Sequence, residues 1–267
     1  MMDGREEIAL KDVSAPRKLP LVIGHRGARR EAPENTLISF QKAIDLGAGG
    51  IEFDVLLTSD KVPVVTHNDD LSVLTQVRGY VHATPFDTVR TLDVGSHFSA
   101  QFAGATMPTL SEVLELASRY DILTIVEIKP QAGLAKSVAR LVGGIVSDIR
   151  MHGPVVVSSS SRKVVKELRR WHPKLSRAVV LWRWPFPFFP LSFFVKKQGI
   201  SAVHASAHLI RPHLAERIKE LCELYAWTVN EAAEIEACLS AGVDGIITDD
   251  VAYVRDYLAG RSAVQRR

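Results

Sequence analysis

The chain contains little cysteine, little net charge and no signal-like start. Its 267 residues include only Cys222 and Cys238, which excludes a fold held together by several disulfides and fits a reducing compartment. The formal charge is +3, with lysine and arginine spread along the chain, which argues against a nucleic-acid surface. The polar N-terminal extension, residues 1–20, lacks the apolar core of a signal peptide.

Long apolar runs are also absent. No uninterrupted stretch reaches the roughly 20 residues that a membrane-spanning helix needs. The nearest candidate, Trp182–Val195, is too short and contains three prolines. We therefore expect a cytoplasmic protein. No Gly-x-Gly-x-x-Gly follows the first apolar segment, and this counts against a dinucleotide-binding fold.

Short apolar runs rich in β-branched residues alternate with longer amphipathic ones. Near-continuous apolar strands are typical of a parallel sheet buried on both faces, and eight repeats favour a closed (β/α)8 barrel over a doubly wound sheet. The expected strands are Leu21–Gly24, Gly50–Val55, Ile122–Ile128, Val155–Val157, Ala178–Trp182, Ala202–His204, Ala226–Val229 and Gly245–Ile247. The expected helices are Glu34–Leu46, Ser111–Tyr120, Leu134–Arg150, Arg162–Trp171, Pro212–Glu223, Ala232–Ala241 and Val251–Leu258.

One stretch interrupts the alternation. Val62–Thr66 reads as a further short strand, and residues 68–108 then show mixed polarity and no helical period. This is longer than an ordinary connection, so we expect a functional or partly folded insertion after the second strand. The domain prediction is a barrel over residues 21–260 that contains this insertion, followed by a basic tail at 261–267.

Carboxylates occur inside two of the apolar strands. Glu52 and Asp54 alternate with apolar residues and therefore point to the same side of their strand, and Glu127 and Lys129 do so on the next barrel strand. Buried carboxylates are costly unless they share a cation. Three carboxylates suit Mg²⁺ or Ca²⁺, with Mn²⁺ as a further candidate, and zinc fits less well because it prefers Cys and His.

Histidines and cations are expected beside these carboxylates. His25 and Arg26 follow the first strand, and His67 ends the extra short strand. In a barrel, the carboxyl ends of the strands carry the catalytic groups. Cations that offset phosphate charge and a histidine pair that moves protons would make a phosphoryl site.

The order and spacing of several segments resemble the glycerophosphodiester phosphodiesterase family over nearly the whole chain from Leu21 to Asp250. The segments that carry the resemblance are His25–Ala28, Pro33–Thr36, Ser39–Phe40, Gly47–Ala48, Ile51–Val55, Asp60, Pro63–Val65, His67, Pro108–Leu110, Glu127–Lys129, Trp227–Asn230 and Gly242–Asp249.

The resemblance implies roles for individual residues. Glu52, Asp54 and Glu127 would bind a divalent cation. His25 and His67 would be the acid/base pair. Arg26 and Lys129 would contact phosphate, and Trp227 would line the pocket unless it is a core aromatic residue. The implied reaction is hydrolysis of a glycerophosphodiester to glycerol 3-phosphate and an alcohol.

The sequence departs from the family pattern beside the second histidine. Asn68 stands where the family usually has Asp, and Asp69 or Asp70 could substitute for it. Val73–Thr75 replaces a usual Arg-Thr-Thr run, and Ser160 stands where an aromatic residue is common. These changes concern the glycerol side of the site and leave the expected metal ligands and both histidines intact.

Three alternatives remain open. The same chemistry could act on a lysophospholipid or another lipid phosphodiester. The barrel could bind phosphorylated ligands or a partner without catalysis, although intact His25, His67 and carboxylates speak against this. An aldolase could use Lys129 as a Schiff-base nucleophile, but adjacent acids would hold its ammonium charged.

The segment Trp182–Phe194 motivates the lipid alternative. It contains seven aromatic residues and follows the fifth barrel strand, so it begins on the face that carries the site. Its prolines oppose a regular helix in the first part, where so much apolar area has no regular face to hide it. We expect contact with an acyl chain or peripheral docking at a membrane, with Phe193 and Phe194 as the residues that could instead pack against the barrel.

Overall fold

The computed structural model describes residues 19–183 and 188–265. The strands are β1 (Leu21–His25), β2 (Gly50–Leu57), β3 (Pro63–Val65), β4 (Leu123–Ile128), β5 (Val155–Ser159), β6 (Ser176–Leu181), β7 (Ala202–Ser206), β8 (Glu223–Trp227) and β9 (Gly245–Thr248). The helices are α1 (Leu37–Asp45), α2 (Phe86–Val89), α3 (Leu110–Ala117), α4 (Ala135–Asp148), α5 (Arg162–Trp171), α6 (Phe188–Gln198), α7 (Pro212–Lys219), α8 (Ala232–Ala241) and α9 (Val251–Gln265).

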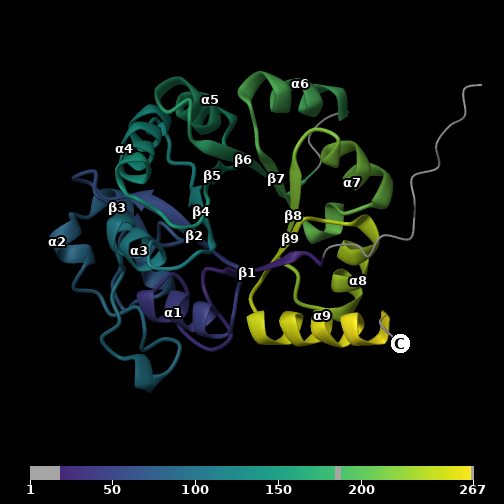
Figure 1. The fold of residues 1–267 in the computed structure, drawn as a ribbon. Coiled ribbons are helices and arrows are strands. Elements are labelled where there is room, and N and C mark those ends of the chain that lie inside the picture. Colours follow the sequence, from purple (N-terminus) through teal and green to yellow (C-terminus); the bar gives the residue numbers. More distant parts are fainter. Residues whose placement is uncertain (1–18, 184–187, 266–267) are drawn as a thin grey trace, which may run out of the picture.

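Eight parallel strands close into a barrel, and the helices surround it (Figure 1). The hydrogen-bonded order is β1-β9-β8-β7-β6-β5-β4-β2, and pairing of β1 with β2 completes the ring. β3 is an additional strand, antiparallel to the end of β2. The predicted (β/α)8, or TIM, barrel is therefore confirmed.

The two faces of β2 show how the sequence divides between two cores. Every residue of this strand is buried. Ile51 and Phe53 belong to the apolar layer between barrel and helices, where the Phe53 ring lies 5.4 Å from that of Phe40 on α1. Because side chains alternate along a strand, Glu52 and Asp54 face the barrel interior.

The interior is a packed core at one end and polar at the other. Small and large apolar side chains from most of the strands fill it. They are Ile23, Leu123, Ile125, Val156, Ala178, Ala202, Tyr225 and Ile247. Four of these residues are followed, two positions later in the chain, by a residue that can hydrogen-bond. The pairs are Ile23 and His25, Ile125 and Glu127, Tyr225 and Trp227, and Ile247 and Asp249. The inward positions thus change from apolar to polar toward the carboxyl ends of the strands, where a barrel places its site.

The boundaries of several elements differ from the predicted ones. The first helix begins at Leu37 rather than Glu34, because the Thr36 side chain accepts a hydrogen bond from the Ser39 N–H. The helix predicted as Pro212–Glu223 ends at Lys219, because Glu223 already starts β8. That strand stops at Trp227, two residues before its predicted end.

Residues 68–108 fold onto the end of β2 around a small core of their own. This core combines Leu56 and Val64 from the strands with residues of the insertion, namely Leu71, Leu74, Val81, Val89, Val94 and Met107. Short helical turns at Leu71–Val73, Val81–Ala83 and Ala100–Phe102, together with α2, account for its lack of a long helical period.

The segment Trp182–Phe194 divides into parts with different environments. Trp182 and Arg183 are exposed, and residues 184–187 lie outside the described residues. α6 begins at Phe188. Phe194 is buried in the layer between barrel and helices, whereas Phe193 is 58% exposed. No helix in the described part of the chain is long and apolar enough to cross a bilayer.

The first prediction concerns the layer between barrel and helices. Phe40 is fully buried against Phe53, so Phe40→Ala should lower the free energy of unfolding by about 3–5 kcal/mol through lost burial and a residual cavity. Ile38→Ala on the same helix, where the side chain is 44% exposed, should cost under about 1 kcal/mol. Chemical denaturation measures both, and equal losses would contradict this packing.

Candidate active site

Three carboxylates from two neighbouring strands meet inside the barrel mouth. Asp54 on β2 and Glu127 on β4 are directly paired in the sheet, and Glu52 lies one pleat below Asp54. One oxygen from each of the three carboxylates lies within 4.8 Å of the others. The alternation of side chains along each strand predicted that Glu52 and Asp54 share one side of β2. The pairing of Asp54 with Glu127 in the sheet brings the third carboxylate beside them. Such a set of hard oxygen donors fits a divalent cation such as Mg²⁺ or Ca²⁺.

The three carboxylates do not share the same electrostatic environment. Burial raises the pKa of Glu52 well above its ordinary value, and the charges of Asp54 and Glu127 raise it further. Burial likewise raises the pKa of Glu127, with Lys129 opposing and Asp54 adding to the shift. Burial would also raise the pKa of Asp54, but Lys129 and Arg26 outweigh it and hold that pKa far below its usual range.

Lys129 and Arg26, the two residues predicted to bind phosphate, form ion pairs with carboxylates of this cluster. Lys129 Nζ is 2.9 Å from Asp54 Oδ1 and 3.0 Å from Glu127 Oε1. Arg26 Nε is 3.2 Å from Asp54 Oδ2, and its Nη1 donates to Glu34 Oε1 at 2.9 Å. Burial alone would lower the pKa of Lys129, but Asp54 and Glu127 raise it, so the amine stays an ammonium. This result disfavours the Schiff-base alternative, which needs a neutral amine.

The turn after β1 presents its backbone to the carboxylates. Arg26 has φ 56°, and its N–H donates to Glu52 Oε2 at 3.2 Å. Gly27 has φ 89°, and a Cβ on it would lie 2.3 Å from Ser39 Oγ, so only glycine fits. Asn35, also at positive φ, donates from Nδ2 to Asp54 Oδ2 at 3.0 Å. The His-Arg-Gly motif therefore forms a tight turn that packs against Ser39 of α1 and directs a backbone N–H at Glu52.

His25 ends β1 and pairs with a carboxylate from the last barrel strand. Its Nδ1 lies 2.6 Å from Asp249 Oδ1, and Asp249 follows β9 directly. Asn230 Nδ2 donates to the other oxygen of Asp249 at 3.0 Å. Burial is the largest influence on His25 and lowers its pKa, while Asp249 acts in the opposite direction. We assign the Nδ1–H tautomer, which leaves Nε2 available on the other side of the ring.

His67 has a neutral partner instead. Its Nδ1 lies 3.1 Å from Asn68 Oδ1, so the residue that replaces the family's usual Asp still orients the ring. Asp69 contacts His82, and Asp70 caps the short helix at Ser72, so both acids are engaged away from the imidazole. Burial lowers the pKa of His67, and the charge of Asp54 opposes this shift as it does at His25. Both histidines therefore sense the same carboxylate.

Trp227 occupies the end of the interior core. It is half-buried, packs against the apolar side chains inside the barrel, and donates from Nε1 to the His204 carbonyl at 3.1 Å. The structure thus shows the core-packing alternative for this ring, at the end of β8 on the side of the site. Its role in lining a substrate pocket stays a prediction.

Four residues that position the site were not assigned a role from the sequence: Glu34, Asn35, Asn230 and Asp249. All four lie in segments that carried the family resemblance. Asp249 could have been found by the rule that located the others, because it directly follows an apolar barrel strand. The two asparagines and Glu34 lie in loops and come into contact only through the fold.

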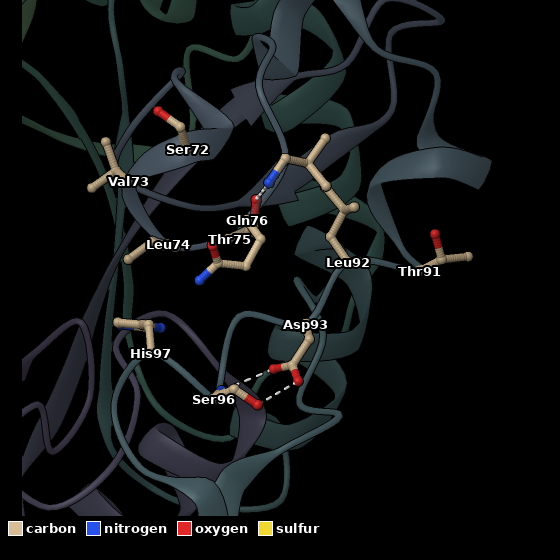
Figure 2. A pocket seen from close by; sticks show the side chains of 11 residues that line it. Ser72, Val73, Leu74, Thr75, Gln76, Thr91, Leu92, Asp93, Ser96 and His97 are labelled. Atoms are coloured by element: carbon tan, nitrogen blue, oxygen red, sulfur yellow. Dashed lines mark hydrogen bonds between the residues drawn. The ribbon is translucent and has the colours of Figure 1, made fainter.

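A pocket of about 500 Å³ lies within the insertion and is separate from these residues (Figure 2). Its one carboxylate, Asp93, accepts hydrogen bonds from the Ser96 side chain and from the Gly95, Ser96 and Gly104 backbones. Those bonds hold the pKa of Asp93 far below its usual range. The Asp93 carboxylate therefore stabilises the loop around residues 95–104 and is already engaged in hydrogen bonds. We assign the pocket no ligand.

Comparison with known proteins agrees with this geometry. A model of the "Glycerophosphoryl diester phosphodiesterase family" matches residues 25–253. The chain is similar to a glycerophosphodiester phosphodiesterase of Caldanaerobacter subterraneus, at 34% identity over 86% of this chain and 94% of the relative.

Solved structures show the same likeness. One is an Oleispira antarctica phosphodiesterase in complex with the product sn-glycerol-3-phosphate, at a TM-score of 0.84 and 26% identity, over 90% of this chain and 97% of that one. Another is a glycerophosphodiester phosphodiesterase from Parabacteroides distasonis, at a TM-score of 0.79 and 25% identity, over 92% of this chain and 100% of that one.

Fold and site together define a class: an enzyme with a (β/α)8 barrel whose mouth is equipped for phosphodiester hydrolysis. The family match over most of the chain and the 34% identical relative make the assignment specific. The chain belongs to the glycerophosphoryl diester phosphodiesterase family.

The second prediction tests the carboxylate cluster without using activity. At neutral pH and in chelator, Glu52→Gln should raise the free energy of unfolding by about 1 kcal/mol or more, because a raised pKa means that ionised Glu52 destabilises the fold. Added Mg²⁺ or Ca²⁺ should raise the melting temperature of the wild type and have little effect on the variant. Glu115→Gln, an exposed acid on α3, should change neither quantity.

The pH dependence of this gain follows from the same shift. The folded-state pKa of Glu52 lies above its ordinary value of 4.5, so the advantage of Gln exists above the folded pKa and shrinks as pH falls. Below about 4.5 the carboxyl is protonated in both states, and wild type and variant should be equally stable. A gain that persists unchanged in acid would contradict like-charge burial as its cause.

Proposed function

We propose that this enzyme hydrolyses glycerophosphodiesters to glycerol 3-phosphate and an alcohol, with a divalent cation on Glu52, Asp54 and Glu127. The observation that carries the proposal is the meeting of this carboxylate cluster with the His25–Asp249 pair and His67 at one barrel mouth. The structural relative from Oleispira, solved with sn-glycerol-3-phosphate, supports the choice of product.

The donor set decides which cations fit. It consists of three carboxylates with no thiolate, so Mg²⁺ and Ca²⁺ suit it best, with Mn²⁺ as a third candidate. When bound, such an ion would supply charge neutralisation and a lowered pKa for a substrate hydroxyl that it contacts. Burial is the main reason why the pKa values of Glu52 and Glu127 are raised, and the ion would relieve the like-charge repulsion that adds to it.

The two histidines would move the protons. In the first step, the glycerol hydroxyl next to the phosphodiester attacks phosphorus, Nε2 of one histidine takes its proton, and the other histidine protonates the departing alcohol. Water then opens the cyclic phosphate with the proton transfers reversed, which gives glycerol 3-phosphate. Asp249 and Asn68 would hold Nδ1 of the two rings, so each Nε2 stays directed at the substrate.

The cations would hold the phosphate. Lys129 and Arg26 neutralise Asp54 in the structure, and both remain charged. A divalent cation on the carboxylates would compete for the same oxygens and leave the two side chains to contact phosphate oxygens. Their position beside the cluster, rather than on the outer surface, fits this use.

A lipid phosphodiester is the second candidate substrate. Trp182 directly follows β6, on the side of the barrel that carries the site, and it is 54% exposed. An apolar ring at that place could accommodate an acyl chain of a lysophospholipid, as in a lysophospholipase D-type reaction. The catalytic groups would be the same.

A substrate panel tests the proposal directly. Glycerophosphodiesters with choline, ethanolamine or inositol head groups and their lysolipid counterparts would be assayed with Mg²⁺, Ca²⁺, Mn²⁺ or excess chelator. We expect release of glycerol 3-phosphate from at least one water-soluble diester with a metal ion and none in chelator. Full activity in chelator would refute the metal role, and inactivity on every diester would refute the substrate class.

The third prediction concerns the acid/base pair. His25→Ala and His67→Ala should each lower turnover by roughly a hundredfold or more, the usual contribution of a general acid or base. Because both act in the same step, the double variant should lose far less than the product of the two single effects. Wild-type turnover in His67→Ala would show that the insertion does not bring this residue into the reaction.

The fourth prediction concerns the partner of His25. Asp249→Asn should lower turnover about 10- to 100-fold with little change in KM, because the amide no longer favours the Nδ1–H tautomer or the imidazolium. The matched control is Asp250→Asn, since this neighbouring acid receives the Tyr253 N–H at the start of α9. An equal loss in both variants would point to disruption of the loop rather than of the histidine pair.

A further inference from the structure

Charge is distributed very unevenly in this chain, although its net value is small. Between Lys136 and Lys197 there are 13 lysine and arginine residues and only two acidic ones, Asp148 and Glu167. The remainder of the chain has 20 basic and 28 acidic residues and is therefore net negative. The mild total of +3 hides a strongly cationic stretch that spans α4, β5, α5, β6 and α6.

The fold places much of this stretch on one outer surface. α5 and α6 lie next to each other outside the barrel (Figure 1). Arg169 on α5 donates a hydrogen bond to the Lys197 carbonyl on α6, and the Arg162 guanidinium lies 5.5 Å from the Phe194 ring. We call this the α5–α6 surface and define it by the exposed side chains Lys163, Lys166, Trp182, Arg183, Phe193 and Lys196.

Aromatic rings lie among these cations. Trp182 is 54% exposed and Phe193 is 58% exposed, the highest values among the large hydrophobic side chains of the described residues. Arg183 stacks 4.5 Å from the Trp182 ring, and Lys197 lies 5.3 Å from the Phe193 ring. Basic side chains interleaved with Trp and Phe are typical of surfaces that lie in the headgroup region of a bilayer.

The same features disfavour a nucleic acid as the partner. Single-stranded nucleic acids bind by stacking bases on open aromatic faces. Here Arg183 covers a face of Trp182, and on α5 the Trp171 ring is flanked by Arg140 at 4.5 Å and Arg170 at 5.3 Å. An aromatic ring with a guanidinium stacked on one face can still insert its edge among lipid headgroups. The stacked cation can at the same time bind a lipid phosphate.

We propose that the α5–α6 surface docks this protein onto membranes that contain anionic phospholipid. Trp182 directly follows β6, on the barrel face that carries His25 and the carboxylates, so docking would hold the catalytic mouth at the edge of the bilayer. Lysolipids, whose acyl chains partition into the bilayer, would be concentrated there. Binding is measured without catalysis, so this proposal and the proposed function can fail separately.

The first arm of the test measures charge. The full-length protein would be sedimented with vesicles of phosphatidylcholine alone or of equal parts phosphatidylcholine and phosphatidylglycerol. We expect binding only to the anionic vesicles, weakened by salt. Lys166→Gln with Lys196→Gln should lower the partition coefficient about fivefold for each charge removed. The matched control removes Arg90, which stacks on Phe86 of α2, and Arg119 beyond α3, by the same change to Gln.

The second arm measures the aromatic contribution. Trp182→Ser with Phe193→Ser should weaken binding to anionic vesicles, whereas Tyr80→Ser, which removes an aromatic ring of 53% exposure from the insertion, should not. All of these variants should melt like the wild type, since the changed side chains are exposed.

Four results would overturn the docking proposal. They are absence of vesicle binding, equal binding to both vesicle types, equal loss in the control variants, and tighter binding to an oligonucleotide than to anionic vesicles at the same salt concentration.

Discussion

The site is governed by the burial of three carboxylates inside one end of the barrel. Glu52, Asp54 and Glu127 lie close enough to share an ion, and two of them have raised pKa values. Lys129 and Arg26 compensate the charge by binding Asp54. Removing buried like charges from each other's field stabilises a fold, so their retention indicates a role in function rather than stability.

The local folds around the cluster follow from that requirement. The turn at Arg26 and Gly27 adopts positive φ so that a backbone N–H can reach Glu52. Asn35 reaches Asp54 from the same stretch of chain. Across the mouth, Asn230 comes from the loop after β8, Asp249 directly follows β9, and Asp249 contacts His25. Residues distant in sequence thus meet because parallel strands end at the same side of a barrel.

The sequence was most informative where strand alternation decides the outcome. The pairs Glu52 with Asp54 and Glu127 with Lys129 followed from period two alone, and the eight apolar runs indicated the barrel. Contacts made by loops, such as Asn35 with Asp54 or Asn230 with Asp249, depend on backbone turns that no periodicity encodes. The insertion lacked a helical period because short turns around a separate small core build it. The environment of Phe193 and Phe194 needed the actual orientation of α6, since adjacent helical residues face different directions.

Charge patterning held a further lesson. The spread of lysine and arginine along the chain argued against a nucleic-acid surface, but it did not reveal that the scarcity of acidic residues between Lys136 and Lys197 leaves one side of the barrel cationic. Net charge therefore described this protein less well than the separate positions of its acids and bases. The same holds at the site, where Asp54 is stable as an anion only because Lys129 and Arg26 are beside it.

The central claim is that the buried carboxylate cluster holds a divalent cation, and anomalous diffraction from crystals soaked in Mn²⁺ tests it most directly. We predict one strong peak about 2.0–2.4 Å from oxygens of Glu52, Asp54 and Glu127, with Lys129 moved away from Asp54. A cluster without a peak, still bridged by Lys129 and Arg26 at saturating Mn²⁺, would contradict the account.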